Sequence, residues 1–221
     1  MNKIQAVLFD LDGTLADTAQ DLALSLNLLL KDQGHSSVAF ERVRPHASHG
    51  SKALIQLGFG IEENSDQFET LKKHFLRIYQ DNLCNKTRLF PGIDQTLKGL
   101  QARGLPWGIV TNKPAFLTDP LVKQLGLEQD AACIISGDTT NNRKPHPEPM
   151  LHACELVPVS AEKCLYVGDA ERDIHAGKQA GMKTLVALYG YIDARDDPEL
   201  WGADGKIESA YAILDWIDHH A

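Results

Sequence analysis

Short apolar runs recur along the chain and alternate with stretches of helical periodicity. Such runs are typical of strands that are buried on both faces of a parallel sheet. They cover residues 4–9, 106–111, 132–137, 164–168 and 184–188. The helical stretches, three of which end at a glycine that can cap the helix, cover residues 94–104, 115–126, 147–156 and 171–181. This alternation predicts an α/β fold built on a doubly wound parallel sheet.

One interval, between the first and second predicted strands, departs from this alternation. It contains three amphipathic stretches and no convincing strand: AQDLALSLNLLLKDQG, ASHGSKALIQLG and SDQFETLKKHFLRIYQDNL. The segment RLFPGI that follows, residues 88–93, has the proline and glycine of a turn. We therefore expect two domains: a core formed by residues 1–16 and 88–221, and a helical insertion formed by residues 17–87.

The composition of the 221 residues narrows the function classes. The formal net charge of -8 argues against binding to nucleic acid through a basic surface. The apolar runs are shorter than the roughly 20 residues that a membrane span needs, and the N-terminal run is too short for a signal peptide. We therefore expect a cytoplasmic protein whose partner is a small molecule, with no role for nucleic acid or membrane.

Polar residues follow the predicted strands where parallel sheets bind their ligands, beyond the carboxyl ends. Two acids follow the first strand, a threonine and an asparagine follow the second, and further acids and a lysine occur around the fourth. This candidate set is Asp10, Asp12, Thr111, Asn112, Lys144, Asp169 and Asp173.

Clustered carboxylates repel one another unless a cation lies among them. Hard oxygen ligands suit Mg²⁺, which keeps part of its water shell. With Mg²⁺ and Lys144 supplying positive charge, a phosphoryl group could approach an ionised carboxylate. The pattern therefore favours phosphoryl chemistry.

The segments DLDGTLADT, VTNKP, KPHPEP and VGDAERD occur in this order. Together they resemble the four motifs of the haloacid dehalogenase-like (HAD) phosphatases, and the strand pattern extends this resemblance over residues 4–188. The resemblance implies a HAD-like Rossmannoid core with a small helical cap inserted after the first strand. It also implies a Mg²⁺-dependent phosphoric monoester hydrolase. We call residues 17–87 the cap segment.

The resemblance assigns chemical roles to the two acids of the first motif. Asp10 would attack phosphorus and form an aspartyl-phosphate. Asp12 would protonate the leaving alcohol and then deprotonate the attacking water. Asp10, the main-chain carbonyl of Asp12 and Asp169 would hold the metal.

The remaining motif residues would bind the phosphoryl group or support the site. Thr111, the backbone amide of Asn112 and Lys144 would hold the phosphoryl oxygens and neutralise their charge. Asp173 would contact the metal through water or orient Lys144.

The cap segment resembles that of the phosphoglycolate phosphatase branch, so the loop RPHASHGSK is expected to contribute to specificity. Arg44 or Lys52 could bind a substrate carboxylate, or both could be solvated surface charges. His46 and His49 could hydrogen-bond sugar hydroxyls. The segment LYGYIDARDDPELWGAD resembles one found in N-acetylmuramic acid 6-phosphate phosphatases. That substrate also has a carboxylate, as 2-phosphoglycolate does, so both remain candidates.

Two other functions have related motifs. A sugar-phosphate mutase of the β-phosphoglucomutase kind shares the motifs and the cap, and it would return the phosphoryl group to a second hydroxyl. A phospho-receiver signalling domain also clusters acids, a threonine and a lysine at strand ends. A receiver has its phosphoacceptor after the third strand, whereas DLDGT follows the first, and it lacks a cap. The sequence leaves the oligomeric state and the resting position of the cap open.

Overall fold

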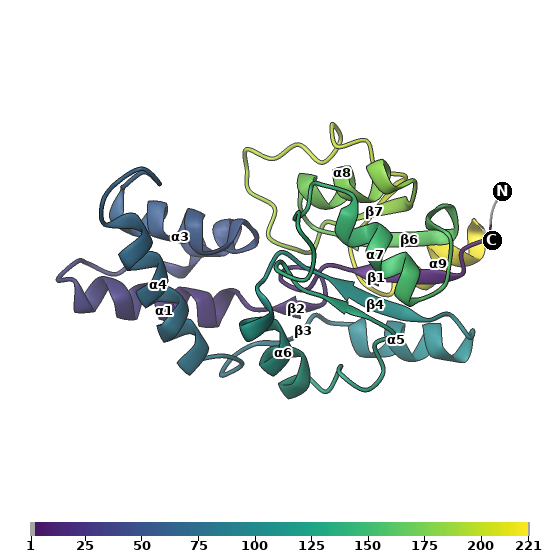
Figure 1. Cartoon of the computed structure of the whole chain (residues 1–221), viewed down its shortest axis with the longest axis horizontal. Helices are drawn as coiled ribbons and strands as arrows, with labels where there is room; N and C mark the ends of the chain where they lie inside the picture. The colour runs from purple at the N-terminus through teal and green to yellow at the C-terminus, as the bar shows by residue number, and fades with distance from the viewer. Residues whose placement is uncertain (1–2, 221) are drawn as a thin grey trace.

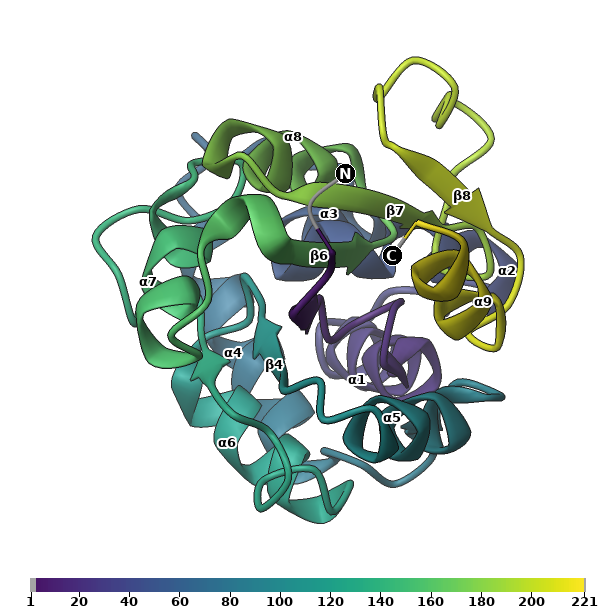
Figure 2. The ribbon, with the colours of Figure 1, turned by 90° about the vertical axis from the view of Figure 1, so that its right-hand side faces the viewer.

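A six-stranded parallel sheet forms the centre of the computed structural model, which describes residues 3–220 (Figures 1 and 2). The strands lie in the order β5-β4-β1-β6-β7-β8, and every neighbouring pair is parallel. Their bounds are β1 Ala6–Phe9, β4 Trp107–Val110, β5 Ile134–Ile135, β6 Cys164–Gly168, β7 Lys183–Ala187 and β8 Gly205–Ile207. The predicted α/β fold with a parallel sheet is confirmed, and only β8 lacks a counterpart among the predicted strands.

Helices cover both faces of the sheet because successive residues of each buried strand point to opposite sides. Ala6 and Leu8 of β1 pack in one apolar cluster with residues of α7 and α8. Val7 and Phe9 pack in the other, with residues of α5, α6 and α9. These helices are α5 Ile93–Ala102, α6 Ala115–Gln124, α7 Glu148–Leu156, α8 Glu171–Ala180 and α9 Ala212–His219.

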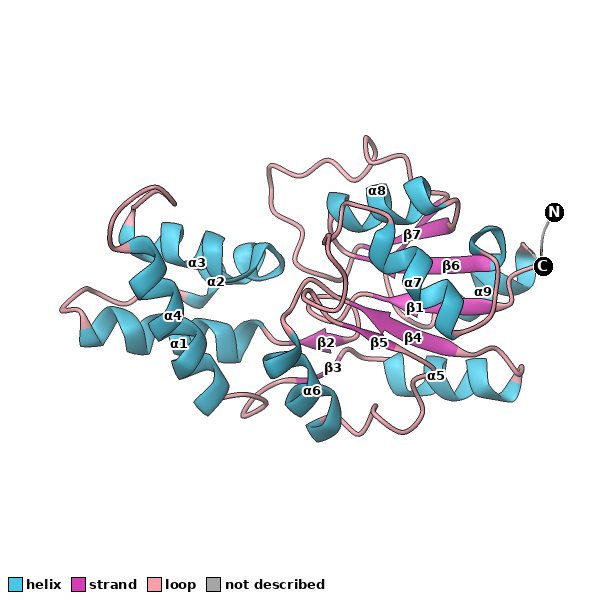
Figure 3. Cartoon of the chain, in the orientation of Figure 1, coloured by secondary structure: helices cyan, strands magenta, loops and turns pink. Residues whose placement is uncertain are grey.

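The cap segment consists of helices that lie beyond the carboxyl ends of the strands (Figures 1 and 3). α1 packs against α3 and α4, and a short α2 and a 3₁₀ helix, η1, connect α1 with α3. Their bounds are α1 Ala19–Asp32, α2 Phe40–Val43, η1 Arg44–His49, α3 Gly50–Phe59 and α4 Phe68–Asp81. The helices expected in this interval are therefore present.

Two short strands connect the cap segment to the sheet. β2, Ala16–Asp17, pairs antiparallel with β3, Arg88–Leu89, so the chain leaves and returns at one place. The division of the chain into two domains at these points remains a prediction. No helix within residues 3–220 is long and apolar enough to cross a membrane.

Candidate active site

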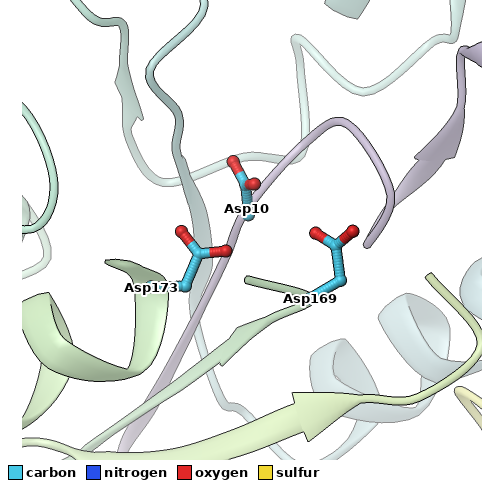
Figure 4. A group of neighbouring side chains, drawn as sticks. All are labelled: Asp10, Asp169 and Asp173. Carbon is cyan, nitrogen blue, oxygen red and sulfur yellow. The ribbon is translucent and has the colours of Figure 1, made fainter. Parts of the chain in front are cut away.

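Three buried carboxylates meet at the ends of β1 and β6, as Figure 4 shows. Asp10 directly follows β1, Asp169 directly follows β6, and Asp173 lies in the first turn of α8. One oxygen from each lies within 4.8 Å of the others, and the side chains are almost fully buried. The backbone amide of Asp10 donates to the carbonyl of Val167 at 2.9 Å, so the pairing of the two strands fixes the spacing of these acids.

Lys144 is the cation that lies among these carboxylates. Its Nζ lies 2.9 Å from Asp10 Oδ1 and 2.8 Å from Asp173 Oδ1. It also lies 2.9 Å from the Tyr166 hydroxyl. The side chain of Asn112 accepts from the backbone amide of Lys144 at 3.0 Å and donates to its carbonyl at 2.9 Å. Asn112 therefore positions Lys144 in addition to the predicted contribution of its own amide.

When ionised, the three carboxylates carry more negative charge than Lys144 and the nearby Arg172 offset. Burial raises the pKa of Asp10, and Lys144 and Arg172 oppose this only in part. Burial, together with Asp10 and Asp173, raises the pKa of Asp169 to about 7. A buried, all-oxygen donor set with excess negative charge fits a hard divalent cation. These three carboxylates could therefore hold a metal ion, while the predicted ligand set of Asp10, Asp12 and Asp169 remains a prediction.

Two glycines allow Asp169 to occupy its position. Gly13 has a φ of +86°, a conformation that side chains disfavour, and a Cβ there would collide with the Asp169 carboxylate. A Cβ at Gly190 would collide with Asp169 and with the carbonyl of Gly13. The glycine of the first motif is therefore required by the close approach of its turn to the acid of the fourth.

Asp12 contacts a second lysine, which sequence analysis did not single out. Asp12 Oδ1 accepts from the Thr18 hydroxyl at 2.6 Å and lies 2.9 Å from Lys113 Nζ. Lys113 also contacts the hydroxyl of Tyr79 on α4 at 3.0 Å. Burial lowers the pKa of Lys113, but the contacts with Asp12 and Tyr79 raise it by more than burial lowers it. The pKa of Lys113 therefore lies above its ordinary value. The position of Lys113 within VTNKP, next to Asn112, was the available signal.

A cavity of about 780 Å³ lies between the sheet edge and the cap segment. Asp10, Asp12 and Thr111 line it from the sheet side, so both acids of the first motif reach the same space. The lining also includes apolar side chains and several cations. Those from the cap segment include Ser48, His49, Ser51, Lys52, Gln56, Phe75, Leu76 and Tyr79, and those from the core include Lys113, Phe116, Arg143 and Arg172.

Residues of the predicted specificity loop RPHASHGSK lie in two different environments. His49 and Lys52 line the cavity. Arg44 is not among the described lining residues. Its guanidinium donates to the carbonyls of Gly190 at 3.1 Å and Tyr189 at 3.3 Å, and it lies 5.0 Å from the centre of the Tyr191 ring. The structure therefore brings Arg44 to the loop after β7 and away from the cavity.

Ser48 is a further residue to which sequence analysis gave no specific role. Its hydroxyl donates to Asp169 Oδ2 at 2.6 Å, and its carbonyl accepts from Arg172 Nη2 at 2.6 Å. Ser48 belonged to the polar loop of the cap segment, and Arg172 to the motif VGDAERD. Neither pattern indicates that the two residues meet.

Comparisons with known proteins found similar sequences and a similar fold. A family model for haloacid dehalogenase-like hydrolases matches residues 7–187. A phosphoglycolate phosphatase of Xanthomonas campestris pv. campestris (strain 8004) is 43% identical over 204 residues, which cover 92% of each chain. An N-acetylmuramic acid 6-phosphate phosphatase of Pseudomonas putida is 37% identical over 216 residues, covering 98% of this chain and 97% of the relative.

A solved structure also has the same architecture. The crystal structure of a "predicted phosphoglycolate phosphatase" from Haemophilus somnus 129PT matches with a TM-score of 0.86 and 30% sequence identity. The match covers 98% of this chain and 99% of the other.

Proposed function

Because the chain belongs to the haloacid dehalogenase-like hydrolase family, we propose that it is a Mg²⁺-dependent phosphatase of a small phosphate ester, acting in the cytoplasm. The observation that carries this proposal is the position of Asp10. Its carboxylate is buried among Asp169, Asp173 and Lys144 and lines the cavity. The two relatives described above are named as phosphatases of small esters, which supports the same reaction class.

In the proposed reaction, a carboxylate oxygen of Asp10 attacks phosphorus while the bond from phosphorus to the ester oxygen breaks. The leaving alkoxide takes a proton from Asp12 and departs as the alcohol. Asp12 then removes a proton from water, which attacks the aspartyl-phosphate at phosphorus and releases inorganic phosphate and the Asp10 carboxylate. General acid–base help of this kind is typically worth about 10²–10⁴ in rate. Both acids line the one cavity, as this sequence of steps requires.

The chain's own groups would supply most of the charge balance. Lys144 is placed to stabilise negative charge on both Asp10 and the transferred phosphoryl group. Thr111 lines the cavity beside the site and would donate to a phosphoryl oxygen. Asp173 accepts from the backbone amide of Ala170 and contacts Lys144, so we assign it to the orientation of that lysine.

A bound Mg²⁺ would act as a Lewis acid on the phosphoryl oxygens. Asp10, Asp169 and the main-chain carbonyl of Asp12 would hold it. The cluster of buried carboxylates supports this assignment, because their mutual repulsion is removed when a cation is bound.

The cavity favours the larger of the two candidate substrates. Volumes of about 300–1,000 Å³ are typical of sites for drug-sized ligands, and a cavity of about 780 Å³ exceeds what a two-carbon phosphate ester fills. Phe75, Leu76 and Phe116 offer apolar surface to the methyl groups of an amino sugar. Arg143 offers charge to its carboxylate, as does Lys52, whose ammonium also pairs with Glu63 at 2.6 Å. We therefore propose N-acetylmuramic acid 6-phosphate as the substrate, with 2-phosphoglycolate as the second candidate.

The deciding experiment compares phosphate release from these two esters, with Mg²⁺ and with EDTA. We expect a higher kcat/KM for the amino sugar, because discrimination is expressed in that ratio. A preference for phosphoglycolate would overturn the choice of substrate. An isomerised sugar phosphate without free phosphate would instead identify a mutase. Activity that survives EDTA would contradict the role of the metal.

A further inference from the structure

The hydroxyl of Ser48, a residue of the cap segment, reaches the predicted metal site at the ends of the strands. We propose that Ser48 supplies an oxygen ligand from the cap segment to the divalent cation held at the ends of β1 and β6. This inference rests on the proposed function, because Asp10, Asp169 and the main-chain carbonyl of Asp12 are the other proposed ligands of the cation. It adds a residue of η1 to a site otherwise built from residues that follow the strands.

The hydroxyl contacts oxygens of Asp169 and Asp12, two of the residues assigned to the cation. Ser48 Oγ lies 2.6 Å from Asp169 Oδ2 and 3.4 Å from the main-chain oxygen of Asp12. Magnesium prefers an octahedron with bonds of about 2.1 Å, in which neighbouring ligand oxygens are about 3.0 Å apart. The two observed distances lie on either side of that value, so Ser48 Oγ is close enough to both oxygens to share a coordination shell with them.

Contacts on both sides hold Ser48 in this position. Its carbonyl accepts from Arg172, which lies on α8 next to Asp173. At the other end of η1, Arg44 binds the carbonyls of Tyr189 and Gly190. In the same loop, the backbone amide of Tyr191 donates a hydrogen bond to Asp169 Oδ2 at 2.9 Å. The segments that position Asp169 and Asp173 thus also position the Ser48 hydroxyl.

The chemistry of a serine hydroxyl suits this role. It is a neutral hard oxygen, so it adds a ligand without adding to the negative charge of the three carboxylates. Mg²⁺ usually keeps several waters, and Ser48 would take the place of one of them. The cation would then join the cap segment to the core. By thermodynamic linkage, binding of the cation and closure of the cap would favour each other.

A role for Ser48 as a hydrogen-bond donor to Asp169 alone also predicts weaker cation binding when the hydroxyl is removed, because outer-shell partners support the ligand that they contact. The two roles differ when the hydroxyl is replaced by another metal-binding group. A ligand role predicts that the metal preference follows the new donor atom, whereas a donor role predicts no such change. Metal preference therefore separates the two interpretations without reference to turnover.

The first test is calorimetric titration of the metal-free wild type, Ser48→Ala and Ser51→Ala with Mg²⁺ in the absence of substrate. Ser51 is the control, because it lies in the same part of the cap segment and lines the same cavity. We expect the Mg²⁺ dissociation constant to rise about 10-fold in Ser48→Ala, the lower end of the loss seen when supporting groups of a metal site are removed. It should stay within about twofold in Ser51→Ala. An unchanged or tighter constant in Ser48→Ala would overturn the inference.

A second variant tests the contact directly. Ser48→Cys places a soft sulfur where the hydroxyl lies, so Cd²⁺ should bind more tightly and Mg²⁺ less tightly than in the wild type. Thiolate-to-metal absorption should accompany the Cd²⁺ binding, with Ser51→Cys and the wild type as references. No gain over Ser51→Cys would overturn the inference.

Phosphate release, measured on the same samples, distinguishes this failure from failure of the proposed function. A wild type without phosphatase activity would overturn the proposed function, while the titrations would still decide the role of Ser48. A wild type that binds no divalent cation would overturn both.

Discussion

Lys113 and Asp12 form an ion pair between the loop after β4 and the loop after β1, with 2.9 Å between Nζ and Oδ1. The two side chains are only 7% and 15% exposed. Lys113 also contacts the Tyr79 hydroxyl and lies 4.6 Å from the centre of its ring. Asp12, the proposed general acid and base, is thus connected through Lys113 to helix α4 of the cap segment.

The first prediction concerns this lysine. Lys113→Met removes the ammonium. Within residues 3–220, the Thr18 hydroxyl is then the remaining hydrogen-bond donor to the Asp12 carboxylate. We expect kcat to fall by about 100-fold, near the lower limit of what general acid–base help contributes. Steady-state kinetics with Lys123→Met, an exposed position on α6, as control would measure it. A kcat equal to that of the wild type would show that Lys113 does not position Asp12.

The second prediction concerns the nucleophile. Asp10→Asn keeps the shape of the side chain but removes its charge, so we expect turnover to fall by at least about 10³-fold. The protein should stay folded, because the substitution also removes one of three mutually repelling carboxylates. Phosphate release and circular dichroism would be compared with those of Asp119→Asn on the exposed side of α6. Appreciable residual kcat would place the nucleophile elsewhere.

The third prediction concerns the metal. Asp169→Ala removes one proposed ligand, so the Mg²⁺ concentration for half-maximal activity should rise by at least about 10-fold. The control is Asp119→Ala, which removes an exposed carboxylate outside the lining of the cavity. Activity is measured against Mg²⁺ concentration after treatment with EDTA. An unchanged titration would exclude Asp169 as a ligand.

The fourth prediction is a pH dependence of stability in the metal-free protein. The pKa of Asp169 is raised from 3.8 to about 7 in the folded state. The folded state therefore holds a proton that the unfolded chain has lost at intermediate pH. The stabilisation from that proton is complete below about pH 3.8 and is lost as the pH rises toward about 7.

Denaturant unfolding in EDTA at pH 5 and pH 8 would test this. The free energy of unfolding of the wild type, taken relative to Asp169→Asn, should decrease as the pH rises. Saturating Mg²⁺ should reverse the trend, because the cation replaces the proton. A difference that does not change with pH would contradict the raised pKa.

The sheet and the central carboxylates could be predicted because both follow from local patterns. Buried parallel strands are apolar runs, and residues that follow such strands meet at one edge. This reasoning predicts that Asp10 and Asp169 lie close together, as the structure places them. The family match confirms the resemblance that the four motifs carry. β8 was missed because its three residues, Gly205–Ile207, contain no apolar run.

The contacts of the cap segment could not be predicted in the same way. Ser48 meets Asp169 across 121 positions of the sequence, and Lys113 meets Tyr79 across 34. Such contacts depend on how the cap helices are oriented against the sheet edge, and this orientation results from tertiary packing. A polar loop predicts exposure or binding, but it does not specify which residue turns toward the cavity and which toward the core.

Arg44 provides the last prediction, because its observed position differs from the role that the sequence suggested. Its two hydrogen bonds hold η1 against the loop after β7. Hydrogen bonds from a charged group are typically worth about 1.5–3 kcal/mol each, so Arg44→Met should lower the melting temperature. It should also raise KM, because the cap segment is held less firmly over the cavity. The exposed Arg42 supplies the control, Arg42→Met.

The decisive measurement compares KM for two phosphate esters, one with a carboxylate and one without. An Arg44 that only holds η1 in place acts equally on both substrates, so the ratio of the two KM values should not change. An Arg44 that binds the substrate carboxylate would raise KM for the first ester alone, because only that ester would lose a charged contact. A change in the ratio would therefore restore the original hypothesis and require the cap segment to move during the reaction.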